Sequence, residues 1–282
     1  MTLLRPSILI AAMLASILPA SPLLGATSRE AASGRALLKQ YADTVVSVEL
    51  VVTVRLTVGD RALPPRESKV EVNGTVISPS GLTVTVLSLV DPRGSLEAMR
   101  AAQGAGASKI EIGESEFKDV KLRLANNAEV PADVVLKDPD LNLIFIAPVV
   151  DPTVPARKFT SVRLDKPATG EILGNYFLIA RGPKSLQRVP IVRITTVLGI
   201  VEKPRMMYLL SEQALGVPIF DSSGLVLGIA TQYLENGRPS SPIVLSAADV
   251  AELATQAAAA KPVKPEAEEQ TSPPVPLPAT KP

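Results

Sequence analysis

This chain contains no histidine and no cysteine, so the candidates for chemistry are found among its serines, lysines and carboxylates. A serine nucleophile would then need lysine as its base, and metal-assisted hydrolysis would need a site built from carboxylates alone. The serine and lysine candidates are Ser211, Ser222, Ser223, Lys184 and Lys203. The carboxylate candidates are Asp133, Asp138 and Asp140. Each set also has a structural interpretation, since Ser-Ser-Gly and Asp-Pro-Asp are typical of turns and lysines of solvated surfaces.

Three segments, in order along the chain, carry a denser pattern of turn residues and β-branched residues. They cover residues 74–90, 120–143 and 216–229. The first contains Pro-Ser-Gly before a Thr-Val-Thr-Val run, the second ends in Asp-Pro-Asp-Leu-Asn-Leu, and the third reads Gly-Val-Pro-Ile-Phe-Asp-Ser-Ser-Gly-Leu-Val-Leu-Gly-Ile. This ordered set resembles the triad-bearing segments of trypsin-like serine proteases of the bacterial Deg, or high-temperature-requirement, type. The resemblance covers residues 42–260.

The resemblance implies positions for a catalytic triad, and all three hold residues that cannot do its chemistry. The histidine position falls on Ser88, the aspartate position on Asn142 and the nucleophile position on Leu215. A hydroxyl cannot act as the base near neutral pH, an amide has no charge to stabilise an imidazolium, and leucine has no nucleophilic atom. Val217, at the family's second glycine, disfavours a φ > 0 conformation there, which weakens the implied oxyanion hole. We therefore expect no enzyme activity, no metal and no cofactor.

The beginning of the chain is typical of a secretory signal peptide. Arg5 supplies a positive charge, an apolar run follows at residues 8–18, and small residues then offer cleavage after Ala20 or Ala26. We predict a signal peptide over residues 1–26 and an exported protein, periplasmic or extracellular, with no integral membrane span after signal cleavage. The alternative is an uncleaved membrane anchor.

Short β-branched runs separated by glycine and proline turns favour an all-β fold. We predict two six-stranded antiparallel β-barrels of the trypsin-like type with a C-terminal helix. The expected parts are an N-terminal helix at 27–43, a first barrel at 44–148, a second barrel with the terminal helix at 149–260, and a disordered Pro-rich tail at 261–282. Ser28 and Ser246 are the expected N-caps of the two helices. The segment 91–117 is longer than a simple connection, and we expect it to cover the former active site.

Charge argues against one class of partner. The 29 basic and 28 acidic residues are spread along the chain for a net charge of +1, so there is no basic stripe for nucleic acid. We predict a secreted pseudoprotease whose cleft or strand edges bind a peptide or protein. Two alternatives stay open, a peptidase with a Ser/Lys mechanism and a structural envelope module. An open apolar cleft at Leu215 and Val217 favours binding, whereas a filled one favours the structural role.

Overall fold

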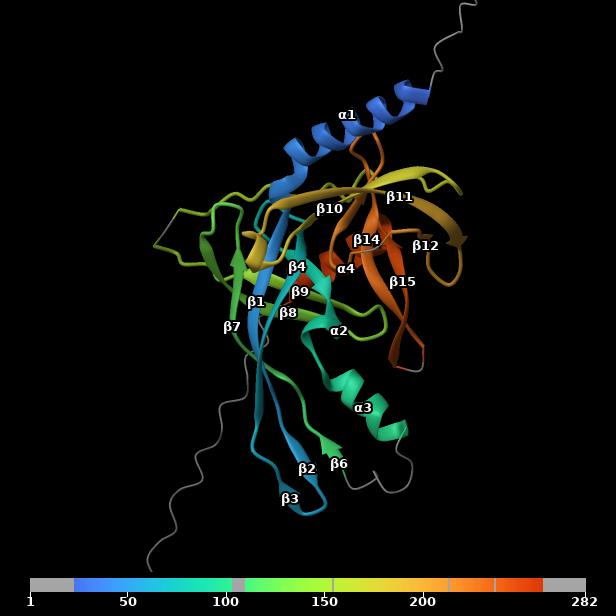
Figure 1. The fold of residues 1–282 in the computed structure, drawn as a ribbon. Coiled ribbons are helices and arrows are strands. Elements are labelled where there is room, and N and C mark those ends of the chain that lie inside the picture. Colours follow the sequence, from blue (N-terminus) through green and yellow to red (C-terminus); the bar gives the residue numbers. More distant parts are fainter. Residues whose placement is uncertain (1–22, 103–109, 154, 213, 236, 261–282) are drawn as a thin grey trace, which may run out of the picture.

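The computed structural model describes residues 23–102, 110–153, 155–212, 214–235 and 237–260. The predicted tail at 261–282, and the predicted signal peptide up to residue 22, lie outside the described residues. The described chain forms two closed barrels, each of six antiparallel strands (Figure 1). The predicted all-β fold with two such barrels is confirmed.

The first barrel is built from Val-rich strands whose interior faces bury almost completely. Its closed order is β1-β4-β5-β9-β8-β7. The strands are β1 (Val45–Val54), β4 (Arg66–Val76), β5 (Thr83–Val86), β7 (Glu116–Arg123), β8 (Glu129–Asp138) and β9 (Leu143–Pro148). β5 and the start of β9 are buried on both faces, as expected for short apolar strands between two layers of protein.

The second barrel repeats the arrangement in the order β10-β11-β12-β15-β14-β13. The strands are β10 (Asn175–Arg181), β11 (Pro190–Val201), β12 (Met207–Leu210), β13 (Pro218–Phe220), β14 (Val226–Glu235) and β15 (Arg238–Ser246). Its buried side chains form one hydrophobic cluster with residues of β5 and β9. The two barrels therefore share an apolar interface rather than hanging from a linker.

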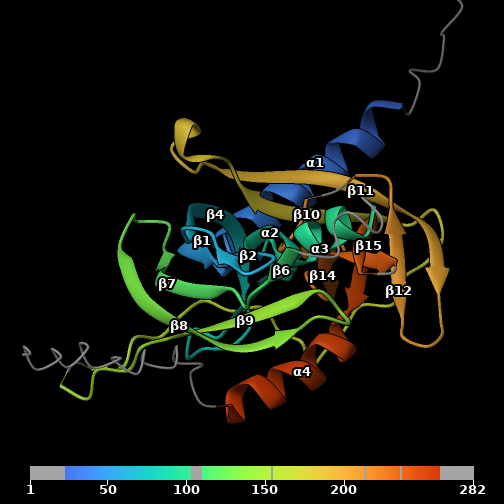
Figure 2. The same ribbon diagram turned by 90° about the horizontal axis from the view of Figure 1, so that it is seen from below.

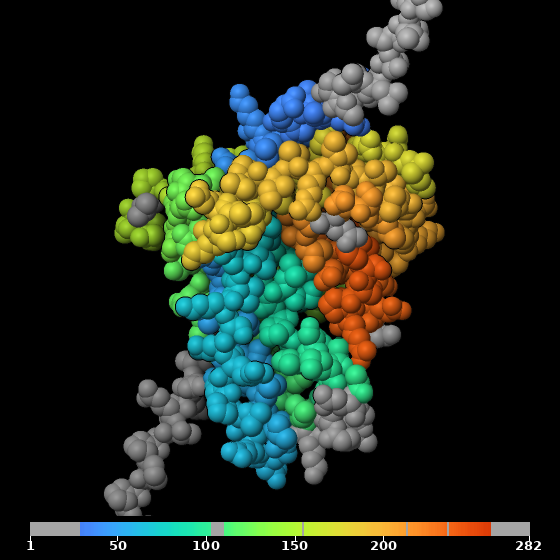
Figure 3. All heavy atoms as spheres, viewed as in Figure 1, coloured from blue at the N-terminus to red at the C-terminus, as the bar shows by residue number. Residues whose placement is uncertain are grey.

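Two longer helices lie on opposite sides of the barrels (Figure 2). α1 (Leu23–Tyr41) crosses β10 and β11, and α4 (Ala247–Ala259) lies against β8, β14 and β15. Figure 3 shows α1, in blue, on the surface of the second barrel. No helix in the described part of the chain is both long and apolar enough to cross a bilayer.

The structure confirms one predicted N-cap and corrects the other. Oγ of Ser246 accepts a hydrogen bond from the backbone N–H of Asp249 at 3.1 Å, as a capping serine does. The N-cap predicted at Ser28 is wrong, because α1 already begins at Leu23. A serine is tolerated within a helix when the chain before it also has helical propensity.

A small lobe projects from the first barrel (Figure 1). It consists of the three-stranded sheet β3-β2-β6 and a helix, preceded by the single turn α2. The elements are β2 (Leu56–Val58), β3 (Arg61–Ala62), β6 (Ile110–Ile112), α2 (Leu87–Val90) and α3 (Arg93–Ala102). Two short 3₁₀ helices, η1 (Ala42–Thr44) and η3 (Lys184–Leu186), complete the described elements.

A carboxylate at the centre of an ion-pair network joins the two barrels. Glu49 on β1 accepts hydrogen bonds from Arg123 of β7 and, at 2.7 Å, from Arg188 of the second barrel. Arg188 also binds Glu71 of β4 at 2.6 Å. The hydrogen bond from Arg123, aided by both arginine charges and opposed by burial, holds the pKa of Glu49 below its ordinary value.

Acid is therefore expected to weaken the fold through Glu49. Its pKa is lower in the folded chain than in the unfolded chain, so its contribution is complete above the ordinary value of 4.5 and is lost as the pH falls through the lowered pKa. The difference in urea stability between the wild type and Glu49→Gln should be largest near neutral pH and should shrink progressively as the pH falls below 4.5. A difference that stays constant from pH 7 to pH 3 would contradict this assignment.

Candidate functional site

The structure brings two of the three predicted triad positions into direct contact. α2 carries Ser88 directly after β5, and Asn142 directly precedes β9. These strands are paired, with Val86 opposite Leu143, so Ser88 and Asn142 meet at the end of the pair. Nδ2 of Asn142 donates to Oγ of Ser88 at 2.9 Å, and the backbone N–H of Ser88 donates to Oδ1 of Asn142 at 2.8 Å.

Asn142 is fixed by its backbone as well as by its side chain. It is 1% exposed and has a left-handed backbone with φ 56°, a conformation that asparagine tolerates better than most residues. Nδ2 also donates to the carbonyl oxygen of Gln232 at 3.1 Å, and the carbonyl oxygen of Asn142 accepts from Leu87 N–H at 2.9 Å. A carboxylate here would set an acceptor against the Gln232 carbonyl and lose both donated bonds. The position is built for an amide.

The loop carrying Leu215 is wedged between the barrels. Oγ1 of Thr75, in the first barrel, donates to the carbonyl oxygen of Gly216 at 2.9 Å. The backbone N–H of Gly216 donates to the Ala230 carbonyl at 2.8 Å. The left-handed residue of this loop is Gly216, with φ 74°, while Val217 does not adopt a positive φ and is fully buried. Val217 therefore serves as a core residue.

The space beside Leu215 is filled. The cavity there has a volume of only about 10 Å³, which is barely enough room for one water molecule. Its walls include the side chains of Leu210, Ile219 and Ile243. A substrate side chain cannot enter here without displacing core residues, so the apolar cleft that would have favoured binding at Leu215 is absent from the described structure.

An open cavity lies instead beside the Ser88–Asn142 pair. Its volume is about 510 Å³, which is within the usual range for ligand pockets. One wall comes from the start of α3 and from Glu114 and Ser115, and the opposite wall from Leu234, Gly237 and Pro239. Described residues of the segment 91–117 therefore line the cavity beside Ser88, the position predicted for the histidine.

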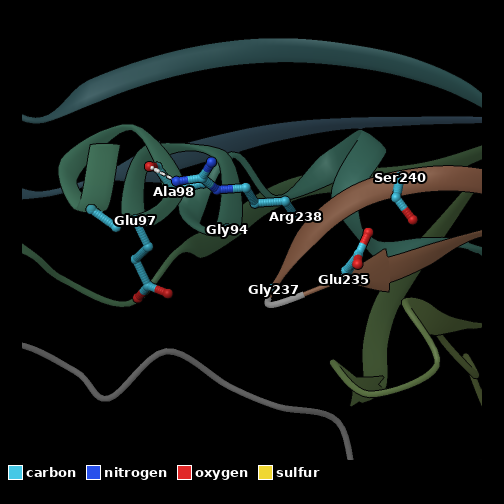
Figure 4. A pocket seen from close by; sticks show the side chains of 8 residues that line it. Gly94, Glu97, Ala98, Glu235, Gly237, Arg238 and Ser240 are labelled. Atoms are coloured by element: carbon cyan, nitrogen blue, oxygen red, sulfur yellow. Dashed lines mark hydrogen bonds between the residues drawn. The ribbon is translucent and has the colours of Figure 1, made fainter. Parts of the chain in front are cut away.

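A second cavity, of about 640 Å³, adjoins the first between α3 and the β14–β15 hairpin (Figure 4). Nη2 of Arg238 on the hairpin donates to the carbonyl oxygen of Ala98 on α3 at 2.8 Å, which ties the two walls together. Glu97 and Gly237 line both cavities. Together the two spaces form one recess, called here the α3 recess, that borders Ser88.

The other candidate residues serve structural roles. Oγ of Ser211 accepts from the Thr196 N–H at 3.0 Å, while Ser222 and Ser223 form the exposed β13–β14 turn, in which Asp221 accepts from Ser223. Lys184 lies on η3 and Lys203 on the β11–β12 connection, so neither is in the α3 recess.

The three candidate aspartates likewise form no ligand set. Oδ1 of Asp138 accepts from the Leu141 N–H at 2.8 Å, which is the turn interpretation of Asp-Pro-Asp. In the described ranges, no three acidic residues are grouped closely enough to hold a metal ion.

Sequence reasoning missed two residues of the site. Gln232 contributes a backbone carbonyl from 90 residues away, so its residue type gives no signal. Lys137 lines the α3 recess, and its Nζ lies 4.7 Å from the ring centre of Phe117, an arrangement typical of a cation–π contact. The structure thereby places one lysine and three serines, Ser88, Ser95 and Ser115, around the same cavity.

Comparison with known proteins bears on the fold. No protein-family model and no curated protein matches the chain. Among solved structures, Deg5 is 16% identical, with 79% of this chain and 92% of that chain covered and a TM-score of 0.51. The MamO protease domain from Magnetospirillum magneticum is 14% identical, covers 76% and 97% of the two chains, and has a TM-score of 0.45. The Rv3671c protease from M. tuberculosis is 18% identical, covers 92% and 97%, and has a TM-score of 0.49. With its paired barrels and terminal helix, this chain has the fold of a trypsin-like serine protease domain of the Deg type.

Proposed function

We propose that this is an exported, non-catalytic trypsin-like protein that binds a peptide or protein partner in the α3 recess. The observation that carries the proposal is the hydrogen-bonded pair formed by the Ser88 hydroxyl and the Asn142 side-chain amide. Trypsin-like catalysis needs an imidazole between a carboxylate and a serine. Here a hydroxyl and an amide bind one another directly, and the chain contains no histidine that another position could supply.

The shape of the site supports binding rather than cleavage. The space beside Leu215 is filled, which leaves no room to seat a substrate side chain next to the former nucleophile position. The α3 recess is open, and its cavities of about 510 and 640 Å³ can each accommodate several side chains of an extended peptide. The filled space at Leu215 on its own favours the structural envelope module, and the open α3 recess is the feature that supports binding instead.

The cavity chemistry keeps a second candidate open, a peptidase with a Ser/Lys mechanism. Lys137 and three serines line the same space. Against this candidate, no serine–lysine hydrogen bond connects the described cavity residues, and Lys137 Nζ lies over the Phe117 ring. A nucleophile needs its base within hydrogen-bond reach.

One experiment separates the two candidates. The chain from Thr27 onward, purified without a histidine tag that would supply imidazole, is incubated with casein and with a fluorophosphonate probe. We expect neither cleavage nor labelling. Cleavage that disappears in Ser88→Ala or Ser115→Ala would overturn the proposal and identify the nucleophile.

The binding site can be tested by filling the recess. Peptides selected on the wild-type chain from a random displayed library should lose at least about tenfold in affinity when Ser95→Trp occupies the cavity, because a filled pocket forfeits the contacts made there. Ser222→Trp, on the exposed β13–β14 turn outside the recess, is the matched control and should bind normally. Equal binding by both variants would place the partner elsewhere.

A further inference from the structure

The turn before β10 exposes two large apolar side chains on a strained backbone. Ile172 is 62% exposed and Leu173 is 74% exposed. The turn is closed by the Gly174 N–H donating to the Glu171 carbonyl at 2.9 Å, and Leu173 has a φ of 63°. A left-handed conformation costs a leucine roughly 1 kcal/mol or more, which glycine or asparagine would avoid. The sequence thus keeps a bulky apolar residue at the tip of a turn where the fold alone disfavours it.

Further exposed leucines adjoin this turn. The Leu173 N–H donates to the Val197 carbonyl at 2.8 Å, and the Val197 N–H donates to the Gly174 carbonyl at 3.1 Å. Leu198, the next residue on β11, lies in a bulge and is 56% exposed. Leu209 on β12 is 37% exposed and is opposite Gly199. We call this set the apolar rim; its members are Ile172, Leu173, Leu198 and Leu209.

The apolar rim lies near the end of α1 from which the preceding chain leaves. Nδ2 of Asn175, at the start of β10, donates to Glu30 of α1 at 2.8 Å. Glu30 is seven residues after Leu23, where α1 begins, which is roughly 10 Å along a helix axis. α1 runs along β10 and β11, and the chain before Leu23 leaves from the end of the helix that points away from the barrels (Figure 1).

The amino-acid sequence of the 22 residues before α1 bears on what this surface contacts. They include the 11-residue apolar run at 8–18. As a helix, 11 residues extend about 16 Å, roughly half of the 30 Å hydrocarbon core of a bilayer. In the uncleaved alternative, this run stays attached to α1 and can insert into a bilayer. A single acyl chain gives only marginal membrane binding and stable attachment takes two signals, and we apply the same reasoning to an apolar segment too short to span.

We propose that the apolar rim is this second contact and rests on the surface of the lipid bilayer into which residues 8–18 insert. Charges of both signs lie near the rim, with Glu171 in the turn and Arg29 beside Glu30 on α1, so we assign the contact to burial of apolar surface rather than to attraction of anionic lipid. The α3 recess lies on the hairpin β14–β15 and on the lobe, away from the β10–β11–β12 surface that carries the rim.

The absence of tryptophan from the chain allows a direct test. In the full chain with Leu173→Trp, the only indole reports on the rim. Adding phosphatidylcholine vesicles should shift its emission to shorter wavelength, and brominated lipids should quench it. Leu186→Trp is the control, because Leu186 is similarly exposed, at 58%, on η3 at the other end of β10. We expect no shift for this variant.

Vesicle flotation of the full chain gives an independent measurement. Ile172→Asn with Leu173→Asn should lower the vesicle-bound fraction at least about tenfold, since two large side chains no longer bury, while asparagine tolerates the left-handed turn and preserves the fold. Leu186→Asn should float like the wild type. Unchanged flotation of the double variant would overturn the proposal. A shift of the Leu173→Trp emission that grows with protein concentration without vesicles would also overturn it, in favour of contact with a second copy of the chain.

Discussion

Arg181→Met is expected to lower the free energy of unfolding by about 3 kcal/mol, because one buried guanidinium from the second barrel satisfies backbone carbonyls at the start of the first. The side chain of Arg181 is 4% exposed. It donates to the carbonyl oxygens of Val45 and, at 2.9 Å, of Ala42, where the chain passes from α1 into β1. Each carbonyl left buried without a partner costs about 1–3 kcal/mol. Burial lowers the pKa of Arg181, yet arginine remains charged near neutral pH.

Thermal and urea unfolding would measure this effect. For a chain of this size, about 3 kcal/mol corresponds to a decrease in Tm of roughly 6–12 °C. The control is Arg163→Met, whose side chain is 64% exposed and pairs only with Asp165 among the described residues, and which should change stability by less than about 0.5 kcal/mol. Arg181→Lys should remain close to Arg181→Met, because an ammonium lacks the planar fork that reaches both carbonyls. Stability of Arg181→Met equal to that of the wild type would mean that water replaces the guanidinium.

Gly216→Ala is expected to destabilise the chain by about 3 kcal/mol or more, through a steric conflict between the barrels as well as through its backbone. The φ of Gly216 is 74°, which by itself costs alanine roughly 1 kcal/mol. A Cβ would in addition overlap the Asn73 carbonyl oxygen and lie 2.7 Å from Oγ1 of Thr85. Moving either oxygen away from the new methyl group would disturb the hydrogen bond between them, in which Oγ1 of Thr85 donates to the Asn73 carbonyl at 2.6 Å.

Gly237 provides a matched control for this substitution. It has the same φ of 74°, but a Cβ there meets no atom within 4 Å. Gly237→Ala should therefore lose only the backbone contribution, about 1 kcal/mol, and the difference between the two variants isolates the contact between the barrels. If urea unfolding gives equal losses, the loop around Gly216 moves to accommodate a methyl group, and it is not wedged as described.

The parts of the fold that could be predicted are those with strong local patterns. Alternating β-branched runs and Pro-Ser-Gly or Asn-Asn turns define strands by local chemistry, and Ser246 before an Ala-rich segment defines a helix start. α1 was predicted too short because its first residues resemble the end of a signal peptide. The β2–β3–β6 sheet could not be predicted, since it depends on pairing between segments about 50 residues apart, such as Leu56 with Ile112.

In the candidate site, too, local sequence patterns predicted some features, whereas others depend on residues distant in the sequence. Aligned motifs placed Ser88 and Asn142 at positions that the structure brings together. They did not reveal why an amide is needed, because the answer lies in the Gln232 carbonyl, which any residue type would supply. Nor could they distinguish the filled space beside Leu215 from the open α3 recess, since volume depends on how distant side chains pack.

The position of α1 determines the order in which parts of the chain can fold and dock. Tyr41 stacks on Phe220 with ring centres 4.5 Å apart, and its hydroxyl donates to the Gly224 carbonyl across 183 positions of sequence. The helix synthesised before either barrel thus finds its docking surface only after most of the second barrel has been synthesised. Contacts of such separation close slowly, because the entropy of a long loop must be lost first. The first barrel can assemble while the chain is still growing, whereas α1 docks on the second barrel last. A fragment containing the second barrel alone would therefore expose the face of Phe220 that Tyr41 covers.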